Sequence, residues 1–140
     1  MIQDCAIVEG NRIIGDGGND VGILVSGGIA ASDRIDNNYF SNLGIAVSLA
    51  GVTVGISVDH NLFALNGGEA IRFSNTSASS IEIADNIIMG DSTTFIMASF
   101  ATHPPSSIFE HNYCDPTLAA CTTCVAASRC TDPTAPFVLP

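Results

Sequence analysis

The stretch that decides the fold is Asp59-His60-Asn61-Leu62-Phe63, because close variants of it recur along the chain. The variants are Gly10-Asn11-Arg12-Ile13, Asn37-Asn38-Tyr39-Phe40, Asp85-Asn86-Ile87-Ile88 and His111-Asn112-Tyr113-Cys114. Their asparagines, at positions 11, 38, 61, 86 and 112, are 27, 23, 25 and 26 residues apart. A repeat of this length is typical of a solenoid, in which similar units stack on one another. The sequence therefore predicts a repetitive architecture before it indicates any chemistry.

Two apolar columns emerge when the repeats are aligned on the asparagine. Three positions before it stand Val8, Ile35, Val58, Ile83 and Phe109. Two positions after it stand Ile13, Phe40, Phe63, Ile88 and Cys114. The residues between these columns are mostly polar, and such alternation is typical of strands with one buried face. Each asparagine is therefore expected in a turn between two short strands.

A third strand is expected further along each repeat. Its first apolar column contains Ile23, Ile45, Ile71 and Ile96, and its second contains Val25, Val47, Phe73 and Ala98. A serine follows in each repeat, at positions 26, 48, 74 and 99. The segments between strands are rich in Gly, Asn, Asp and Ser, which suit turns, and no segment has a ten-residue helical period.

Strands that recur by the stacking of similar units are parallel, and crossovers between parallel strands are overwhelmingly right-handed. We therefore predict an all-β fold, namely a right-handed parallel β-helix that is a single-stranded solenoid of about five coils with a period of about 25 residues. The β-helix is expected over residues 1–116, with a Cys/Pro-rich C-terminal cap over residues 117–140. We expect the N-terminal end to be covered by a homo-oligomer contact or by a preceding part of a longer chain.

The stacking gives the repeated asparagines a structural role. Asparagines in successive coils lie about 4.8 Å apart, the distance between neighbouring strands. At that distance each side-chain amide can donate to one neighbour and accept from another. We therefore expect a hydrogen-bonded ladder of Asn11, Asn38, Asn61, Asn86 and Asn112.

The repeat resembles those of the pectate-lyase-like superfamily of right-handed β-helices, which includes secreted polysaccharide lyases, hydrolases and epimerases as well as phage tailspikes. The resemblance covers about residues 6–116 and rests on the motif Asn-x-Phe/Ile, followed by Asn or Asp and Gly, and then by Gly-Ile-x-Val. It implies the fold. Because this fold carries many chemistries, the resemblance implies no more about function than a carbohydrate-directed role.

The two positions before the asparagine form an acidic, histidine-bearing stripe. One column is Glu9, Asp36, Asp59, Ala84 and Glu110, and the next is Gly10, Asn37, His60, Asp85 and His111. Because the first column alternates with a buried one, we expect it to face the solvent. Carboxylates in adjacent coils repel one another, which raises some of their pKa values or favours a bound cation such as Ca²⁺.

Three interpretations of this stripe stay open, namely an ordinary solvated face, a site for a sugar or cation, and a catalytic site. For a ligand or cation the expected residues are Glu9, Asp36, Asp59, His60, Asp85, Glu110 and His111. For catalysis the candidates are Asp59, His60 and Asp85, because carboxylates at this spacing serve retaining glycosidases and histidine can act as an accessory base. No cofactor is expected, with Ca²⁺ as the open alternative, and no dedicated metal site is predicted. Arg34, interpreted as an exposed partner of Asp33 or Asp36, matches no lyase motif.

Four cysteines near the C-terminus, Cys114, Cys121, Cys124 and Cys130, have the spacing C-x6-C-x2-C-x5-C. Disulfides are typical of a small cysteine-dense cap, whereas a structural zinc site would want two paired knuckles. Free thiols are the third alternative. We expect disulfides and with them an extracellular or cell-surface location, although the first five residues contain no signal peptide.

The composition restricts the partners of the protein. Its 140 residues include 14 acidic and 4 basic side chains, which gives a formal net charge of −10. Nucleic acids and anionic membranes are not expected as partners, since both require a basic surface. We expect a non-catalytic surface or recognition module with carbohydrate as its ligand class. The alternatives are a polysaccharide lyase, hydrolase or epimerase that uses the outward Asp/His stripe, and a structural piece of a longer tailspike or adhesin.

Overall fold

A computed structural model of the chain describes residues 7–26, 33–50, 55–64, 69–73, 79–89, 94–98, 106 and 108–114. Within these residues every regular element is a β-strand and none is a helix. The strands are β1 (Ile7–Glu9), β2 (Arg12–Ile14), β3 (Val21–Val25), β4 (Arg34–Asp36), β5 (Tyr39–Ser41), β6 (Ile45–Leu49), β7 (Ser57–Asp59), β8 (Leu62–Ala64), β9 (Glu69–Phe73), β10 (Glu82–Ala84), β11 (Ile87–Met89), β12 (Thr94–Ala98), β13 (Ile108–Glu110) and β14 (Tyr113–Cys114). The prediction of an all-β fold is confirmed for the part of the chain that the structure describes.

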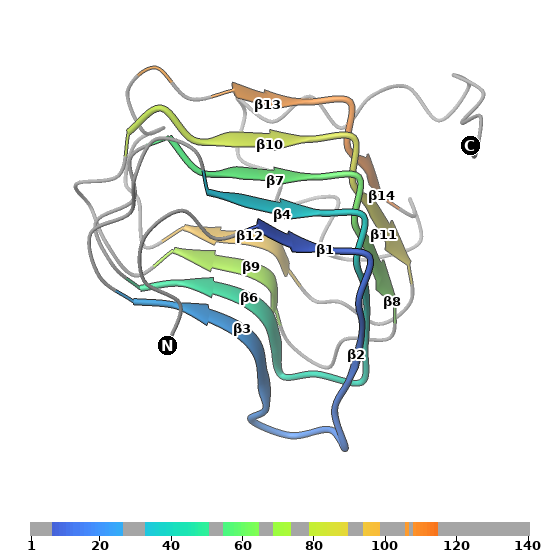
Figure 1. Cartoon of the computed structure of the whole chain (residues 1–140). Helices are drawn as coiled ribbons and strands as arrows, with labels where there is room; N and C mark the ends of the chain where they lie inside the picture. The colour runs from blue at the N-terminus through green and yellow to red at the C-terminus, as the bar shows by residue number, and fades with distance from the viewer. Residues whose placement is uncertain are drawn as a thin grey trace.

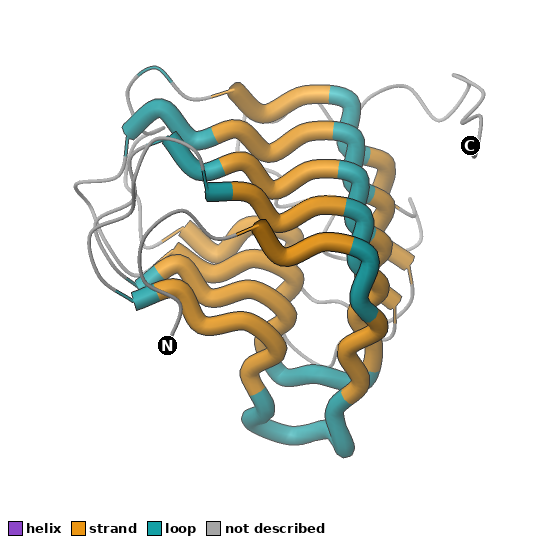
Figure 2. The backbone as a smooth tube through the Cα atoms, in the orientation of Figure 1, coloured by secondary structure: helices purple, strands orange, loops and turns teal. Residues whose placement is uncertain are grey.

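The strands form three sheets in which every third strand along the chain is a neighbour. The first sheet has the order β1-β4-β7-β10-β13, the second β2-β5-β8-β11-β14, and the third β3-β6-β9-β12. All of the pairs are parallel. We call three successive strands, such as β1, β2 and β3, a layer, and the layers stack on one another (Figures 1 and 2). This regular stacking of parallel strands is compatible with the predicted parallel β-helix.

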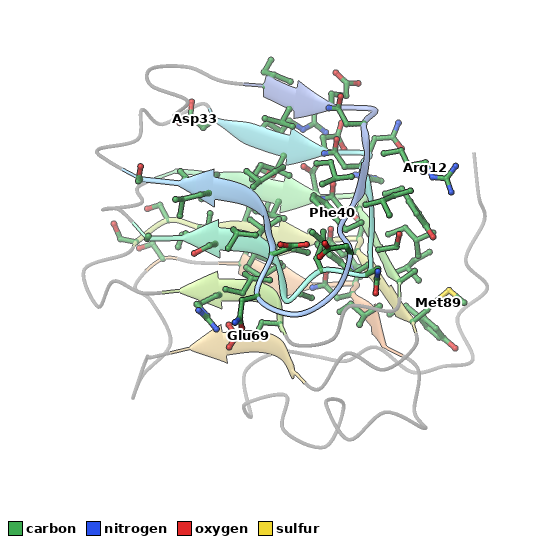
Figure 3. All side chains as sticks on the ribbon, turned by 90° about the horizontal axis from the view of Figure 1, so that it is seen from below. Arg12, Asp33, Phe40, Glu69 and Met89 are labelled. Carbon is green, nitrogen blue, oxygen red and sulfur yellow. The ribbon has the colours of Figure 1, made fainter. Side chains whose placement is uncertain are left out.

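The apolar columns on either side of the asparagine fill the interior of the stack. The buried members are Ile35, Val58 and Ile83 in the first sheet and Phe40, Phe63 and Ile88 in the second. The rings of Phe40 and Phe63 stack with a centroid distance of 5.1 Å and an interplanar angle of 9°, and Phe40 lies among the strands in Figure 3. Burial of one large apolar side chain stabilises the fold by about 1.5–3 kcal/mol, so these columns hold neighbouring layers together.

The asparagines at positions 11, 38, 61, 86 and 112 are hydrogen-bonded to one another along the stack. In the four pairs, Nδ2 of one asparagine donates to Oδ1 of the next over 3.1, 3.1, 3.0 and 2.9 Å. The backbone N–H of the same donor residue binds the same oxygen. All five except Asn11 are buried. The bonds therefore satisfy polar groups that have no access to water.

The third sheet differs from the expected alignment in one layer. Ile23 pairs with Val47 and Val47 with Ile71, so Ile45 is not in the column to which we assigned it. Ser48 consequently lies within β6 beside a leucine and an arginine, and the predicted serine column is wrong at this position. A shift of two residues keeps every side chain on the same face of a strand. The alternation of apolar residues therefore cannot detect such a shift.

Several predictions concern side chains outside the described part of the chain. These are the side chains of Phe109, Glu110 and Cys114, the cysteines at 121, 124 and 130, and the expected cap at residues 117–140. The disulfides and the cap therefore stay predictions. Among the described residues, no helix has the length and apolar character needed to cross a membrane.

Candidate functional site

The acidic stripe lies at the turn that joins the first sheet to the second. A groove with a cavity volume of about 710 Å³ follows this turn along the stacking direction. Its walls include four residues from the column just before the asparagine and the first residues of the strands that follow the turn, namely Gly10, Asn37, His60, Asp85, Arg12, Tyr39, Leu62 and Ile87. The same turn of successive layers thus lines one continuous groove.

The column just before the asparagine has a backbone explanation for its residue types. Its members all have positive φ angles, of 67° at Gly10, 56° at Asn37, 54° at His60, 52° at Asp85 and 53° at His111. This left-handed conformation is unfavourable for most residues, but glycine adopts it freely and Asn, Asp and His are enriched in it. The polar character of this column therefore follows first from the turn. Chemistry is not needed to explain why these residue types recur there.

The column two positions before the asparagine does not face the solvent as we predicted. Asp36 and Asp59 are each only 8% exposed, and Ala84 is buried as well. Glu9 is exposed, and for Glu110 only the backbone is described, which pairs with Ala84. Both aspartates lie on the face of their strand opposite the buried Ile35 or Val58, but other polar side chains of that face cover them. Asp36 is covered by Arg34 of its own strand and by His60 of the following layer, and Asp59 is covered by Arg34 of the preceding layer.

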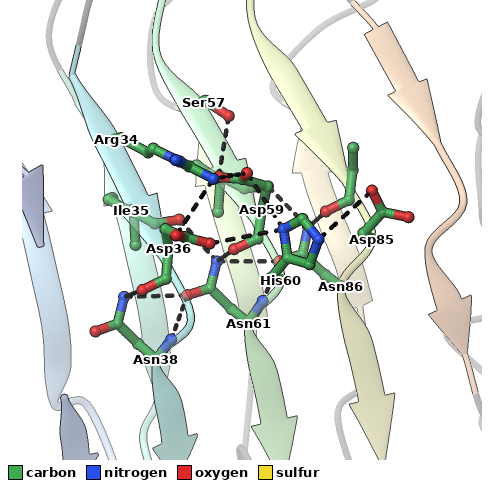
Figure 4. Close-up of polar contacts among 12 residues, drawn as sticks. Arg34, Ile35, Asp36, Asn38, Ser57, Asp59, His60, Asn61, Asp85 and Asn86 are labelled. Carbon is green, nitrogen blue, oxygen red and sulfur yellow. Dashed lines mark hydrogen bonds and ion pairs between the residues drawn. The ribbon is translucent and has the colours of Figure 1, made fainter. Parts of the chain in front are cut away.

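Arg34 binds both buried carboxylates (Figure 4). Its Nη2 lies 2.7 Å from Asp59 Oδ2 and 3.2 Å from Asp36 Oδ2, and its Nε donates to Asp59 Oδ1 over 3.2 Å. Asp59 also accepts a hydrogen bond from the Ser57 hydroxyl at 3.1 Å. The expectation that Arg34 pairs with a residue of its own strand was thus incomplete. Its two-point contact is with the carboxylate of the following layer.

His60 extends this network toward the groove. Its Nδ1 lies 3.3 Å from Asp59 Oδ2 and 3.6 Å from Asp36 Oδ1, and its Nε2 lies 4.0 Å from Asp85 Oδ2. Asp85 in turn lies 3.8 Å from Nδ1 of His111. The structure therefore brings together Asp36, Asp59, His60, Asp85 and His111. Carboxylates and imidazole rings alternate along this part of the turn.

The two buried carboxyl groups differ in their affinity for a proton. Burial, together with the negative charge of Asp59, raises the pKa of Asp36 despite the nearby Arg34 and His60. Burial also acts to raise the pKa of Asp59, but hydrogen bonds from Arg34 and Ser57, the charge of Arg34 and the contact with His60 lower that pKa below its usual value. Asp59 also raises the pKa of Arg34. Asp59 is therefore the fixed anion of the site, and Asp36 is the group more easily protonated.

The same atoms define what the site could hold. One ligand atom each from Asp36, Asp59 and His60 lies within 4.8 Å of the other two, and carboxylate oxygens are the ligands that Ca²⁺ prefers. Arg34, however, already places a positive charge against both carboxylates. A cation would therefore have to displace this guanidinium or share the two carboxylates with it. Hydrogen bonding to a neutral polar ligand requires no such displacement.

Two groove residues were not predicted from the sequence. The guanidinium carbon of Arg12 lies 5.5 Å from the centroid of the Tyr39 ring, in cation–π contact, and Figure 3 shows Arg12 directed away from the interior. The two residues are paired in register on β2 and β5. The signal that could have identified them is their shared position one residue after the asparagine, where both side chains face out.

No protein-family model, curated protein or solved structure matches the chain.

Proposed function

We propose that the chain is a right-handed parallel β-helix of the pectate-lyase-like type, with about five coils, and that it is a non-catalytic recognition module. The ligand class that we propose is a linear carbohydrate bound along the groove. The observation that carries this proposal is the composition of the groove. The same turn of successive layers supplies both hydrogen-bond donors and hydrogen-bond acceptors beside an aromatic ring.

The spacing of the groove supports an extended ligand. Equivalent residues in neighbouring layers are about 4.8 Å apart, so the four groove positions from Gly10 to Asp85 span about 14 Å. Successive residues of a linear glycan repeat at a similar interval. Each sugar ring would therefore meet a similar set of groups, as is common on the long binding surfaces of repeat proteins.

The chemistry of the groove supports a polyhydroxylated ligand. Arg12 and Arg34 donate hydrogen bonds, Asp36 and Asp85 accept them, and His60 can do either. Sugar hydroxyls require both kinds of partner. Tyr39, which is partly exposed, adds an aromatic surface with a polar tip. A nucleic acid or an anionic membrane would instead require a surface of predominantly positive charge.

The ion-pair network supports binding rather than turnover. Asp59 is held by Arg34, Ser57 and His60 at once, so its oxygens are already occupied by neighbours. A nucleophile or general base needs an oxygen directed at the substrate. The groove therefore presents hydrogen-bonding groups that the ion-pair network holds in fixed positions.

A second candidate function, glycan cleavage, is favoured by one observation. The pKa of Asp36 is raised and that of Asp59 is lowered, and such divergence between neighbouring carboxyl groups is found in acid–base pairs. In this alternative Asp36 would be the proton donor and Asp59 the anion beside it.

The test is a binding screen by calorimetry on polygalacturonate, alginate, and cellulose and mannan oligosaccharides. We expect binding of at least one glycan and a loss of affinity of about tenfold for Tyr39→Ala and for His60→Asn, since one hydrogen bond or aromatic contact contributes about 1.4 kcal/mol. His60→Asn retains a residue type that tolerates the left-handed backbone. Arg72→Gln is the control, because Arg72 is a partly exposed arginine that forms an ion pair with the buried Glu69 on a different sheet.

The same samples decide between the two candidates. Each glycan is incubated with the wild-type protein, and new reducing ends and unsaturated products are measured. Product formation that disappears in Asp36→Asn and Asp59→Asn would establish the enzyme. Absence of binding to the whole panel, or equal binding by Tyr39→Ala, His60→Asn and wild type, would overturn the recognition proposal for this groove.

A further inference from the structure

Three successive layers place a histidine, an aspartate and a histidine at the turn position just before the asparagine. These residues are His60, Asp85 and His111, and their φ angles of 54°, 52° and 53° show that the three turns have the same backbone conformation. Glycine and asparagine, which occupy this position in the first two layers, would serve such a turn equally well. Imidazole and carboxylate groups are common ligands of divalent transition metals, Zn²⁺ among them. The row therefore brings two imidazoles to the two sides of one carboxylate.

The carboxylate of Asp85 faces a nitrogen of each imidazole without a hydrogen bond to either. Its Oδ2 lies 4.0 Å from His60 Nε2, and its Oδ1 lies 3.8 Å from His111 Nδ1. Both distances are longer than those of a hydrogen bond. Two ligands of a tetrahedral zinc ion lie about 3.4 Å apart, because each ligand bond is about 2.0–2.2 Å long. Each gap therefore has to close by only about 0.5 Å to fit the ligand spacing around an ion.

The acidic side chains behind His60 orient it as a metal ligand (Figure 4). Its Nδ1 lies 3.3 Å from Asp59 Oδ2 and 3.6 Å from Asp36 Oδ1. Because the ionised carboxylate of Asp59 can only accept hydrogen bonds, the ring proton is on Nδ1 and the lone pair is on Nε2. Histidines that bind metals donate their other N–H to a carboxylate in the same way. The nitrogen that remains free to bind a metal, Nε2, is the one that faces Asp85.

No arginine of the described ranges competes for the Asp85 carboxylate. Arg34 binds Asp36 and Asp59, whereas the described ion-pair partners of Asp85 are the two histidines of the row. The side chains of the row are 56%, 42% and 62% exposed in chain order, so they are accessible from the solvent and can change rotamer. The formal net charge of −10 attracts cations to the protein as a whole.

We propose that His60, Asp85 and His111 form a binding site for one divalent transition-metal ion of the zinc class. The ligands are His60 Nε2, a carboxylate oxygen of Asp85 and His111 Nδ1. The two imidazoles come from layers on either side of Asp85, so they lean toward its carboxylate when the ion binds. Three protein ligands leave a fourth position of a tetrahedral ion for water. The inference does not rest on the proposed function, since the ion binds without a glycan.

The first test is a calorimetric titration of the full chain with ZnCl₂ at neutral pH, with no glycan present. We expect the wild type to bind Zn²⁺ and the affinity to fall about tenfold or more in each of His60→Asn, Asp85→Asn and His111→Asn. Asparagine tolerates the left-handed backbone at all three positions, so these variants keep the turn. His103→Asn is the matched control, because it removes the third histidine of the chain, and it should bind Zn²⁺ like the wild type.

The result that would overturn the proposal is absence of Zn²⁺ binding by the wild type, or equal affinity in the wild type and the three variants. Equal affinity would place the ion elsewhere, for example on the cysteines near the C-terminus. A loss confined to His60→Asn would place the ion between Asp36 and Asp59 and would also overturn the proposal.

A second measurement needs no variant and therefore stays decisive if a substitution impairs folding. Paramagnetic Co²⁺ is titrated into the wild-type chain, and the imidazole signals are followed by NMR. We expect the signals of His60 and His111 to broaden first, while the signal of His103 stays sharp. Sharp signals of His60 and His111 in the presence of bound Co²⁺ would exclude the site.

Discussion

Replacement of Asn61 by alanine is the sharpest test of what holds the layers in register. Asn61 is 1% exposed, and its Nδ2 donates to Ile35 O, Asp59 O and Asn86 Oδ1, while its Oδ1 accepts the N–H and Nδ2 of Asn38. Alanine removes all of these bonds. The buried N–H of Asn38 then has no acceptor, which costs about 1–3 kcal/mol, and the lost bonds add about 1 kcal/mol or more. We expect Asn61→Ala to lower the free energy of unfolding by about 3–4 kcal/mol.

The matched control lies in the same column. Asn11 is exposed, it donates to Glu9 O and Asn38 Oδ1, and no described residue donates to its Oδ1. Asn11→Ala should therefore cost about 1 kcal/mol. Urea unfolding followed by circular dichroism, at a low protein concentration, measures both variants. Equal destabilisation by Asn61→Ala and Asn11→Ala, within about 0.5 kcal/mol, would refute the idea that the buried asparagines stabilise the stacked layers.

Substitutions at three further positions test the turn, the ion pair and the packing of glycine. His60→Val should destabilise the protein by about 1–2 kcal/mol in urea unfolding while His60→Asn leaves it within about 0.5 kcal/mol, because only the latter suits a φ of 54°; equal costs would exclude the backbone explanation. Arg34→Gln should raise the pKa of Asp59 in a carbon-detected NMR titration and cost about 1 kcal/mol at pH 7, a figure that allows for the partial exposure of the arginine. The low folded pKa of Asp59 stabilises the protein fully above the unfolded pKa of about 3.9, and this stabilisation is lost as the pH falls through the folded pKa. Wild type and Arg34→Gln should therefore converge as the pH falls below about 4, and a constant difference would contradict the assignment. Gly44→Ala should cost about 1–3 kcal/mol in thermal unfolding, since an added Cβ collides with Gly18 O, and an unchanged melting temperature would argue against this close approach.

The layered fold could be predicted from the sequence because its determinants are local and repeated. Val58 and Phe63 recur as apolar residues at fixed distances from Asn61, and each column is buried in the inner layers for the same physical reason. The third strand was less predictable. A displacement of two residues preserves the face on which Ile45 lies, so only the pairing with neighbouring strands determines the register there.

The candidate site was predictable in location but not in character. The sequence placed Asp36, Asp59 and His60 in neighbouring columns, and the structure brings them within ion-pair distance. It could not indicate that Arg34 spans two layers to bind both aspartates, because that contact depends on side-chain length and rotamer across a strand pair. Nor could it indicate that His60 occupies a left-handed turn, since a recurrent polar residue there has both a conformational and a chemical explanation.

The left-handed turn position also affects how such a protein can diverge over evolutionary time. The backbone at this position accepts a small set of residue types, Gly, Asn, Asp and His, which differ greatly in charge and hydrogen bonding. Exchanges within that set change what a layer displays to the groove while the turn itself is preserved. The residues at this turn position can therefore be exchanged one layer at a time, with each intermediate still folded. For protein engineering, the five positions, each limited to these four residue types, form a small combinatorial library. New binding specificities can be selected from it without redesign of the scaffold.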